Sequence, residues 1–165
     1  MKRRSGQALL ETVLYLPFLL LFLVGTIELG KIVYTYFALQ KTLYEIARLA
    51  GTQQGINLCD PNDPLLNQSI VTVLTGTPAG TGAPLIQGLA ATDIQVRVER
   101  YDPGSGGLAQ CACSIAGCDT ASGGLPPDFL VVSLVNGYNV TPIFPLFKVD
   151  PIPLRPIIRL PYGGT

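Results

Sequence analysis

The chain has 165 residues, with eleven basic and eleven acidic side chains and no histidine. Its charges balance and form no basic stripe, which argues against a nucleic-acid partner. Without histidine, Ser–His and Cys–His dyads and imidazole metal ligands are excluded. We therefore expect neither an enzyme nor a cofactor or metal site.

The N-terminus combines a basic leader, a small residue and an acidic residue inside an apolar run. Residues 2–4 are basic, Gly6 follows, and Glu11 comes five positions later. The chain carries no further charge from residue 12 to residue 27. A carboxylate in hydrocarbon is costly and needs a reason. The free amine of a neighbouring subunit, cut between Gly6 and Gln7, would supply one. This arrangement is typical of type IV pilin-like proteins; in a simpler alternative Glu11 only extends to the lipid headgroups.

Residues 7–27 are predicted to cross a bilayer. A helix of this length spans about 31 Å at 1.5 Å per residue, which matches the hydrocarbon thickness. The basic leader would keep the N-terminus in the cytoplasm and place everything after Lys31 in the other compartment. A cleaved secretory signal peptide fits less well, because no A-x-A site follows the apolar run. Pro17 cannot donate to the carbonyl of Val13, so we expect a bend there.

The helix is expected to continue as an amphipathic stalk over residues 28–51. No proline or glycine interrupts residues 31–50, and apolar residues recur there at steps of three and four. The residues of this stripe are Ile32, Tyr36, Leu39, Leu43, Ile46 and Ala50. Glu28 and Lys31 have i,i+3 spacing, which favours a pair near the outer membrane interface. A contact between Glu28 and another subunit is the alternative.

The helix region resembles the TadE-like proteins, which are minor pilins or pseudopilins of the tight adherence (Tad/Flp) pilus system. The resemblance covers about the first third of the chain and rests on four segments. They are Arg4-Ser-Gly-Gln-Ala-Leu-Leu-Glu11, the leucine-rich stretch through Leu16-Pro17, Ile27-Glu28-Leu29-Gly30, and Tyr34 to Ala50 ending Ile46-Ala-Arg-Leu-Ala50. Thr12 stands where the major Flp pilins carry tyrosine, which argues against a major pilin.

The resemblance implies cleavage after Gly6 by a membrane prepilin peptidase and a role in pilus biogenesis and surface adhesion. The implied partners are inner-membrane lipid, the peptidase, and other pilin subunits with their assembly machinery. Glu11, Pro17 and Glu28 are the candidate assembly residues. The competing hypothesis is a non-polymerising, signal-anchored envelope protein whose head binds a partner. A secreted soluble domain is a third and weaker alternative.

All four cysteines follow the predicted membrane span: Cys59, Cys111, Cys113 and Cys118. An even number of cysteines outside the cytoplasm favours disulfides. Cys111 and Cys113 are separated by one residue and are poor partners for each other. We therefore expect Cys59 to pair with one cysteine of the cluster and the other two to close a small loop. The spacing does not fit common zinc sites.

Residues 52–165 are predicted to form an extracytoplasmic head. The clearest strand is 93–101, where apolar and polar residues alternate. Residues 129–140 are predicted to return as a central strand, and residues 102–127 to form a disulfide-braced hairpin loop. The fold class is thus α+β and type IV pilin-like, with a long N-terminal transmembrane helix that continues into a stalk packed on a small antiparallel β domain.

Two other parts of the head are harder to assign from sequence. Residues 65–74 are expected to begin as a helical turn and to finish as a strand at 70–74. Six prolines from Pro142 to Pro161 exclude a central strand or a continuous helix at the C-terminus. Extended stretches there carry Ile143, Phe144, Leu146 and Phe147. We expect them to cover the core of the domain; the membrane surface or a docked partner is the alternative.

Carboxylates are the remaining candidates for acid–base chemistry. Asp60, Asp63, Asp102 and Asp119 all lie near prolines or glycines. Such positions are typical of turns and helix caps, so we predict structural roles for these four residues.

Overall fold

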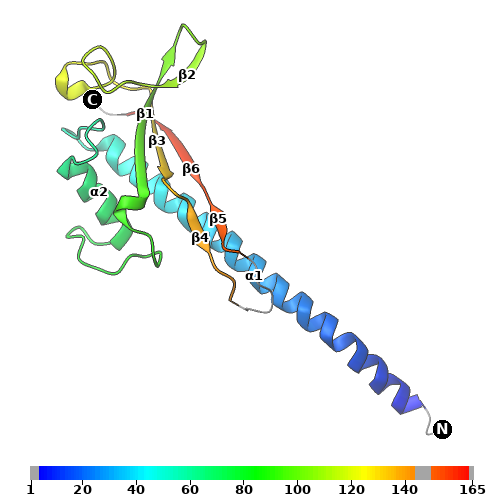
Figure 1. The fold of residues 1–165 in the computed structure, drawn as a ribbon. Coiled ribbons are helices and arrows are strands. Elements are labelled where there is room, and N and C mark those ends of the chain that lie inside the picture. The colour runs from blue at the N-terminus through cyan, green and yellow to red at the C-terminus, as the bar shows by residue number, and fades with distance from the viewer. Residues whose placement is uncertain (1–3, 144–149, 164–165) are drawn as a thin grey trace.

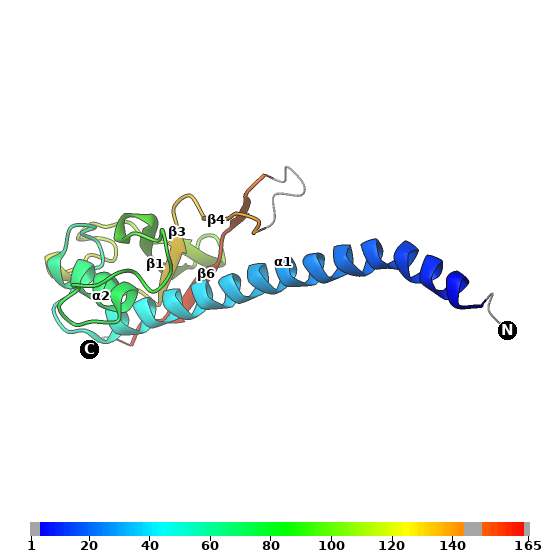
Figure 2. The same ribbon diagram turned by 90° about the horizontal axis from the view of Figure 1, so that it is seen from below.

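The structure, a computed structural model, describes residues 4–143 and 150–163. One long helix, α1 (Arg4–Thr52), runs through most of the length of the molecule. The small α+β head packs on its C-terminal half, while its N-terminal half projects alone (Figures 1 and 2). The predicted fold class, a long helix carrying a small antiparallel β domain with disulfide-braced loops, is confirmed.

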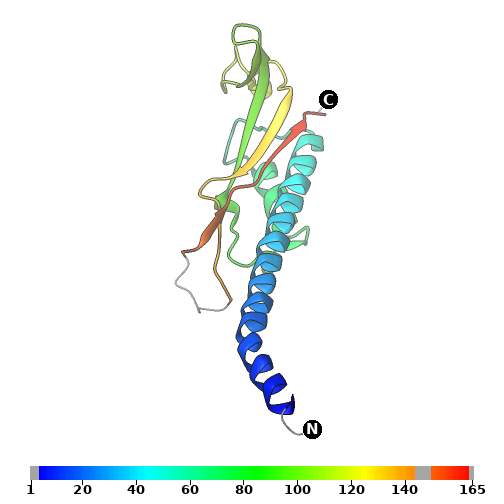
Figure 3. The same ribbon diagram turned by 90° about the vertical axis from the view of Figure 1, so that its right-hand side faces the viewer.

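The projecting half of α1 is apolar and has no protein packed on it. Every residue from Leu9 to Leu23 is exposed. Among the described residues, α1 is the one helix long and apolar enough to cross a membrane. The helix continues without a break through Pro17, and Figure 3 shows it curving in its dark-blue N-terminal part. A proline inside a helix removes one backbone hydrogen bond, which accounts for such curvature.

The other half of α1 supplies the central surface of the head core. Leu39, Leu43 and Ile46 are fully buried, as the apolar stripe predicted. Ile32 is only half-buried and Tyr36 is exposed, so the buried core of the head begins between Tyr36 and Leu39. Each large apolar side chain buried in this way contributes about 1.5–3 kcal/mol.

Helix α2 (Pro64–Thr75) corrects the prediction of a strand at 70–74. The run Ile70-Val-Thr-Val-Leu74 is rich in β-branched residues, which favour strands when judged locally. However, Leu66, Ile70 and Leu74 recur every four residues, and all three are buried. Tertiary packing of this helical stripe against α1 outweighs the local preference.

Both ends of α2 carry sequence signals for a helix boundary, and the predicted turn or cap role of Asp63 is confirmed. The Asp63 carboxylate accepts hydrogen bonds from the N–H groups of Leu65 at 2.8 Å and Leu66 at 2.9 Å. Pro64 occupies the first turn, where its missing N–H costs nothing. Gly76 ends the helix in the left-handed conformation, with φ 69°.

The head contains a four-stranded antiparallel sheet in the order β2-β1-β3-β6. Its strands are β1 (Ile94–Asp102), β2 (Gly107–Gln110), β3 (Phe129–Leu134) and β6 (Ile157–Pro161), and short 3-10 turns lie at Ala91–Asp93 and Thr120–Ser122. Two predictions are confirmed here: the strand at 93–101 and the central position of the strand that begins at Phe129. In its described part, the proline-rich C-terminus contributes β6 at the edge of this sheet and one short strand outside it, which agrees with its exclusion from the sheet centre. Phe144, Leu146 and Phe147, which were expected to cover the core, lie outside the described residues.

One face of the sheet packs into the core. Ile94 lies opposite Leu134, and Val98 lies opposite Leu130, across the β1–β3 pair. These side chains and Val132 join the buried cluster formed by α1 and α2. Strand β3 is therefore buried on the helix side by packing against α1.

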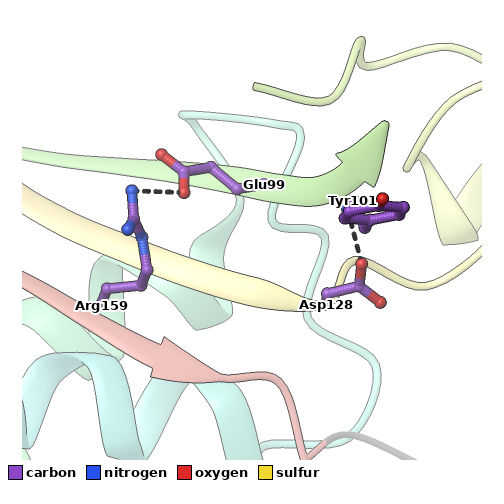
Figure 4. A network of polar contacts seen from close by, with 4 residues as sticks. All are labelled: Glu99, Tyr101, Asp128 and Arg159. Carbon is purple, nitrogen blue, oxygen red and sulfur yellow. Dashed lines mark hydrogen bonds and ion pairs between the residues drawn. The ribbon is translucent and has the colours of Figure 1, made fainter. Parts of the chain in front are cut away.

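The other face of the sheet carries polar contacts that cross the strands (Figure 4). Glu99 Oε2 of β1 lies 2.8 Å from Arg159 Nη2 of β6, so this ion pair reaches over the intervening strand β3. Val131 of β3 lies beside Arg159 in the register and is almost fully buried. The Tyr101 N–H donates to Asp128 Oδ2 at 2.7 Å, which ties β1 to the start of β3.

The predicted strand over 129–140 is interrupted after Leu134. It continues as β4 (Tyr138–Val140), which pairs with β5 (Ile152–Leu154) in a separate two-stranded ribbon. Between the two ladders, residues 134–137 oppose only residues 155–156. This bulge redirects the ribbon out of the sheet. Gly137 permits the bend, because its φ is 76° and a Cβ there would lie 2.9 Å from the Arg155 side chain.

Two disulfides brace the loops at the end of the head that lies near the C-terminal end of α1. Cys59 pairs with Cys113, and Cys111 pairs with Cys118, with Cα–Cα distances of 5.4 and 5.8 Å. The expected pattern of one long and one short loop is confirmed. The structure also decides that Cys113, and not Cys111 or Cys118, is the partner of Cys59.

The two disulfides are expected to differ in their effect on stability. Replacing Cys59 and Cys113 with serine should lower the free energy of unfolding by about 4 kcal/mol, because they are 54 residues apart. The matched double variant at Cys111 and Cys118, 7 residues apart, should lose about 2 kcal/mol. Denaturant unfolding of the full-length protein in micelles, followed by circular dichroism, measures both; equal losses would contradict the loop-length explanation.

Candidate assembly and processing site

The candidate cleavage point lies at the start of α1. The helix begins at Arg4, so the peptide bond between Gly6 and Gln7 belongs to its first turn. Gln7 and Glu11 are four residues apart on a continuous helix and therefore share a face, separated by about 6 Å along the axis. Cleavage after Gly6 would create an α-amine one turn away from the Glu11 carboxylate.

Glu11 is exposed on an otherwise apolar surface. It borders a shallow depression lined by Thr12, Tyr15, Leu16 and Leu19. Among the residues whose side chains are described, from Leu9 to Ile143 and from Asp150 to Gly163, none donates a hydrogen bond to its carboxylate. An ionised carboxylate in lipid needs a partner, so this geometry favours a donor supplied by another molecule.

Pro17 does not belong to the same surface as Glu11. Six residues separate them, which corresponds to about 120° around the helix at 3.6 residues per turn. The Val13 carbonyl that lacks its usual intrahelical donor therefore lies away from the Glu11 side. Pro17 shapes the curvature of the projecting helix, while Glu11 supplies the charge.

Glu28 lies about 25 Å from Glu11 along the helix axis, at the far end of the apolar run. Glu28 Oε1 accepts a hydrogen bond from the backbone N–H of Ile143 at 2.7 Å. Lys31 Nζ donates to the backbone carbonyl of Thr141 at 2.5 Å. Sequence reasoning paired Glu28 with Lys31 and missed these contacts, since their partners are 115 and 110 residues away.

The four carboxylates near turns serve the local structure. Each accepts hydrogen bonds from backbone N–H groups two or three residues further along the chain. The pairs are Asp60 with Asn62, Asp63 with Leu65 and Leu66, Asp102 with Gly104 and Ser105, and Asp119 with Ser122. The hydrogen bond from Gly104, followed by those from Ser105, lowers the pKa of Asp102 below its ordinary value.

The head also has a groove between α2 and β1. Strand β2 pairs only with residues 99–102 of β1, so the preceding residues of β1 face the groove without a neighbouring strand. The groove has a volume of about 510 Å³, and Ile70, Val96 and Arg97 are among its lining residues. An uncovered strand edge offers backbone N–H and C=O groups to an extended peptide.

The fold and the apolar helix define a class of protein: an α+β, pilin-like chain with a single helix suited to membrane anchoring. Within that class, residues 6–48 match the family described as TadE-like protein, in agreement with the resemblance. This match over residues 6–48 supports an association of the chain with the Tad pilus, and the TadE-like family is a structural one. The match includes Glu11, Pro17 and Glu28 and leaves almost the whole head outside it. No curated protein and no solved structure matches the chain.

The contact between Glu28 and Ile143 can be tested by hydrogen exchange. Changing Glu28→Ala removes the acceptor of the Ile143 amide. Because a hydrogen bond to a charged group contributes about 1.5–3 kcal/mol, its exchange should rise about tenfold or more. Glu28→Gln keeps an acceptor oxygen and should preserve most of the protection. Unchanged exchange in Glu28→Ala, measured by NMR or mass spectrometry, would rule out the contact.

Proposed function

We propose that this chain is a minor pilin or pseudopilin of the tight adherence pilus, processed after Gly6, which contributes to pilus biogenesis and surface adhesion. The observation that carries the proposal is the placement of Gln7 and Glu11. Both lie on one continuous helix and one face, and Glu11 is exposed on an apolar surface. A processed N-terminus supplies an amine and Glu11, one turn later, supplies a carboxylate, and these two groups can pair between neighbouring subunits.

The contact would form between subunits as follows. Cleavage leaves a protonated amine on Gln7, and the Glu11 carboxylate of a neighbouring helix pairs with it inside the membrane. Each charge offsets the desolvation of the other, so docking in the correct register is favoured over other registers. The exposed apolar residues from Leu9 to Leu23 then pack between helices or against lipid. The inner-membrane lipid, the prepilin peptidase and neighbouring pilins are the proposed partners.

The proposed orientation has the leader in the cytoplasm and the head outside it. The basic residues 2–4 favour this topology. Two disulfides in the head agree with an oxidising compartment. In the proposed boundaries, residues 1–6 are the leader, 7–27 span the inner membrane, 28–51 form the stalk and 52–165 form the head.

A second candidate function is supported by the groove between α2 and β1. In this alternative the chain is anchored but does not polymerise, and the head binds a partner through the uncovered edge of β1. Glu11 would then be dispensable. The two candidates therefore predict different outcomes for processing and for Glu11 substitution.

The first experiment determines the intact mass and N-terminal sequence of the protein purified from its native membranes. We expect a chain that starts at Gln7, because Gly6 lies before the apolar run as prepilin processing requires. Gly6→Asp should block the cut and leave the basic leader in place. A wild-type chain that keeps residues 1–6 would support the anchored, non-polymerising alternative.

Substitution of Glu11 tests assembly separately from processing. Glu11→Ala should leave the mature N-terminus at Gln7 but reduce pilus number about tenfold or more, since breaking a buried charge pair costs about 3–5 kcal/mol. Glu11→Gln should give an intermediate loss. Glu45→Ala is the matched control, because it removes an acidic side chain from the stalk part of the same helix. Normal piliation in Glu11→Ala, counted by electron microscopy, would contradict the proposed contact.

A further inference from the structure

The β4–β5 ribbon brings a part of the head to the base of the proposed stalk. From the sheet, the ribbon extends toward the level of the projecting half of α1 and stands off the helix along its length (Figures 1 and 3). The segment after β4 contacts α1 through Glu28, which directly follows the uncharged run that ends at Ile27. In the proposed orientation, Ile143 therefore lies at the level where the helix leaves the membrane.

Two polar backbone groups of this segment are satisfied by side chains of α1, and a third group is absent. The Ile143 N–H is bound to Glu28, and the Thr141 carbonyl is bound to Lys31. Pro142, between them, has no N–H. Irregular backbone at membrane depth is tolerated only where its polar groups have partners. This pattern therefore suits a segment that lies in a poorly hydrated environment.

Strand β5, which pairs with β4, also lacks backbone N–H donors at some positions. Pro151 and Pro153 flank Ile152 in β5 and contribute no N–H groups. Ile152 pairs with Val140 across the ribbon, so the β4–β5 ladder accounts for backbone polar groups on its inner side. Pro142, Pro151 and Pro153 together remove three backbone donors from this part of the ribbon.

Apolar side chains at the same level are exposed. Ile143 is 51% exposed and Ile152 is 38% exposed. On α1, Leu29, Val33 and Tyr34 are 63%, 50% and 76% exposed. These three residues continue the apolar surface of the projecting helix. Tyr34 thereby lies at the level of the proposed membrane–water interface, where aromatic residues are enriched. Water is a poor environment for this combined surface, and the headgroup–acyl boundary of a bilayer is a suitable one.

We propose that the tip of the β4–β5 ribbon, Thr141–Ile143 with Ile152, is a second membrane contact that inserts into the lipid interface beside α1. Glu28 and Lys31 hold the segment in place and satisfy its backbone. The head is thereby attached to the membrane at two points, which restricts its rotation about the helix axis. The proposal rests on the membrane span proposed above, and the occupant of the surface is phospholipid.

The chain has no tryptophan, so one introduced indole is an unambiguous reporter. The test variant is Ile143→Trp, reconstituted at low protein-to-lipid ratio in phosphatidylcholine vesicles with brominated acyl chains. Because interfacial groups lie about 5–10 Å into the headgroup–acyl boundary, the bromines should reduce its emission by about half relative to unbrominated vesicles. Ile115→Trp, in the disulfide loop at the other end of the head and 71% exposed, is the control that should be unaffected.

Phe22→Trp, within the proposed span, separates the two proposals. Quenching of both Phe22→Trp and Ile143→Trp supports the membrane span and the interfacial contact. If Phe22→Trp is quenched and Ile143→Trp is not, the interfacial contact is wrong and the membrane span stands. If neither is quenched, the membrane span itself is wrong. If emission from Ile143→Trp changes with the protein-to-lipid ratio instead of with bromination, a second copy covers the surface and the lipid contact is overturned.

The roles of Glu28 and Ile143 can be separated in the same background. Glu28→Ala combined with Ile143→Trp should lose most of the quenching, because the segment is no longer fastened at the membrane level. Glu28→Gln combined with Ile143→Trp should retain it. Full quenching in the alanine combination would show that Glu28 does not position the segment.

Discussion

The structure depends on one helix whose two halves lie in different environments, one exposed and apolar and the other packed under the head. From Leu9 to Leu23 the side chains of α1 are exposed and, apart from Glu11 and Thr12, mostly apolar, so they require lipid or other helices. From Leu39 onward an apolar stripe on the same helix is buried under the head. Among the described residues, the head has no other helix or strand of comparable length on which to assemble its core. Every contact that positions the head therefore also orients it relative to the projecting apolar half of α1.

The head is held to this helix by different interactions at its two ends. Near the apolar run, Glu28 and Lys31 bind the backbone of residues 141–143. At the opposite end, the disulfide between Cys59 and Cys113 joins the chain that leaves α1 to the loop beyond β2. The packed core lies between these two attachments. A cross-link at one end and charge-assisted hydrogen bonds at the other give a rigid head and a base that depends on the charge of its side chains.

The charged residues of α1 therefore have separate roles despite their common helix. Glu11 faces outward within the apolar run and is suited to contact with another subunit. Glu28 contacts the head of its own chain. Because Pro17 lies about 120° away from Glu11 around the helix, it affects the curvature without entering the same contact. A substitution in α1 is thus expected to affect assembly, head position or helix shape according to its place on the helix.

The sequence alone determined the features that depend on local pattern: the apolar helix, its buried stripe from Leu39, the alternating strand β1, and a disulfide from Cys59 to the later cluster. It failed at α2, where β-branched residues suggested a strand and the four-residue apolar repeat was overlooked, although a turn or cap role for Asp63 was predicted. Only the tertiary structure decided that Cys113 is the partner of Cys59, that the strand after Phe129 bends at Gly137, and that Glu28 binds Ile143. The disulfide partner and the Glu28 contact depend on segments that are 54 and 115 positions apart in the sequence. Helical and strand periodicity depends only on neighbours within a few residues, so it gives no information about contacts between distant segments.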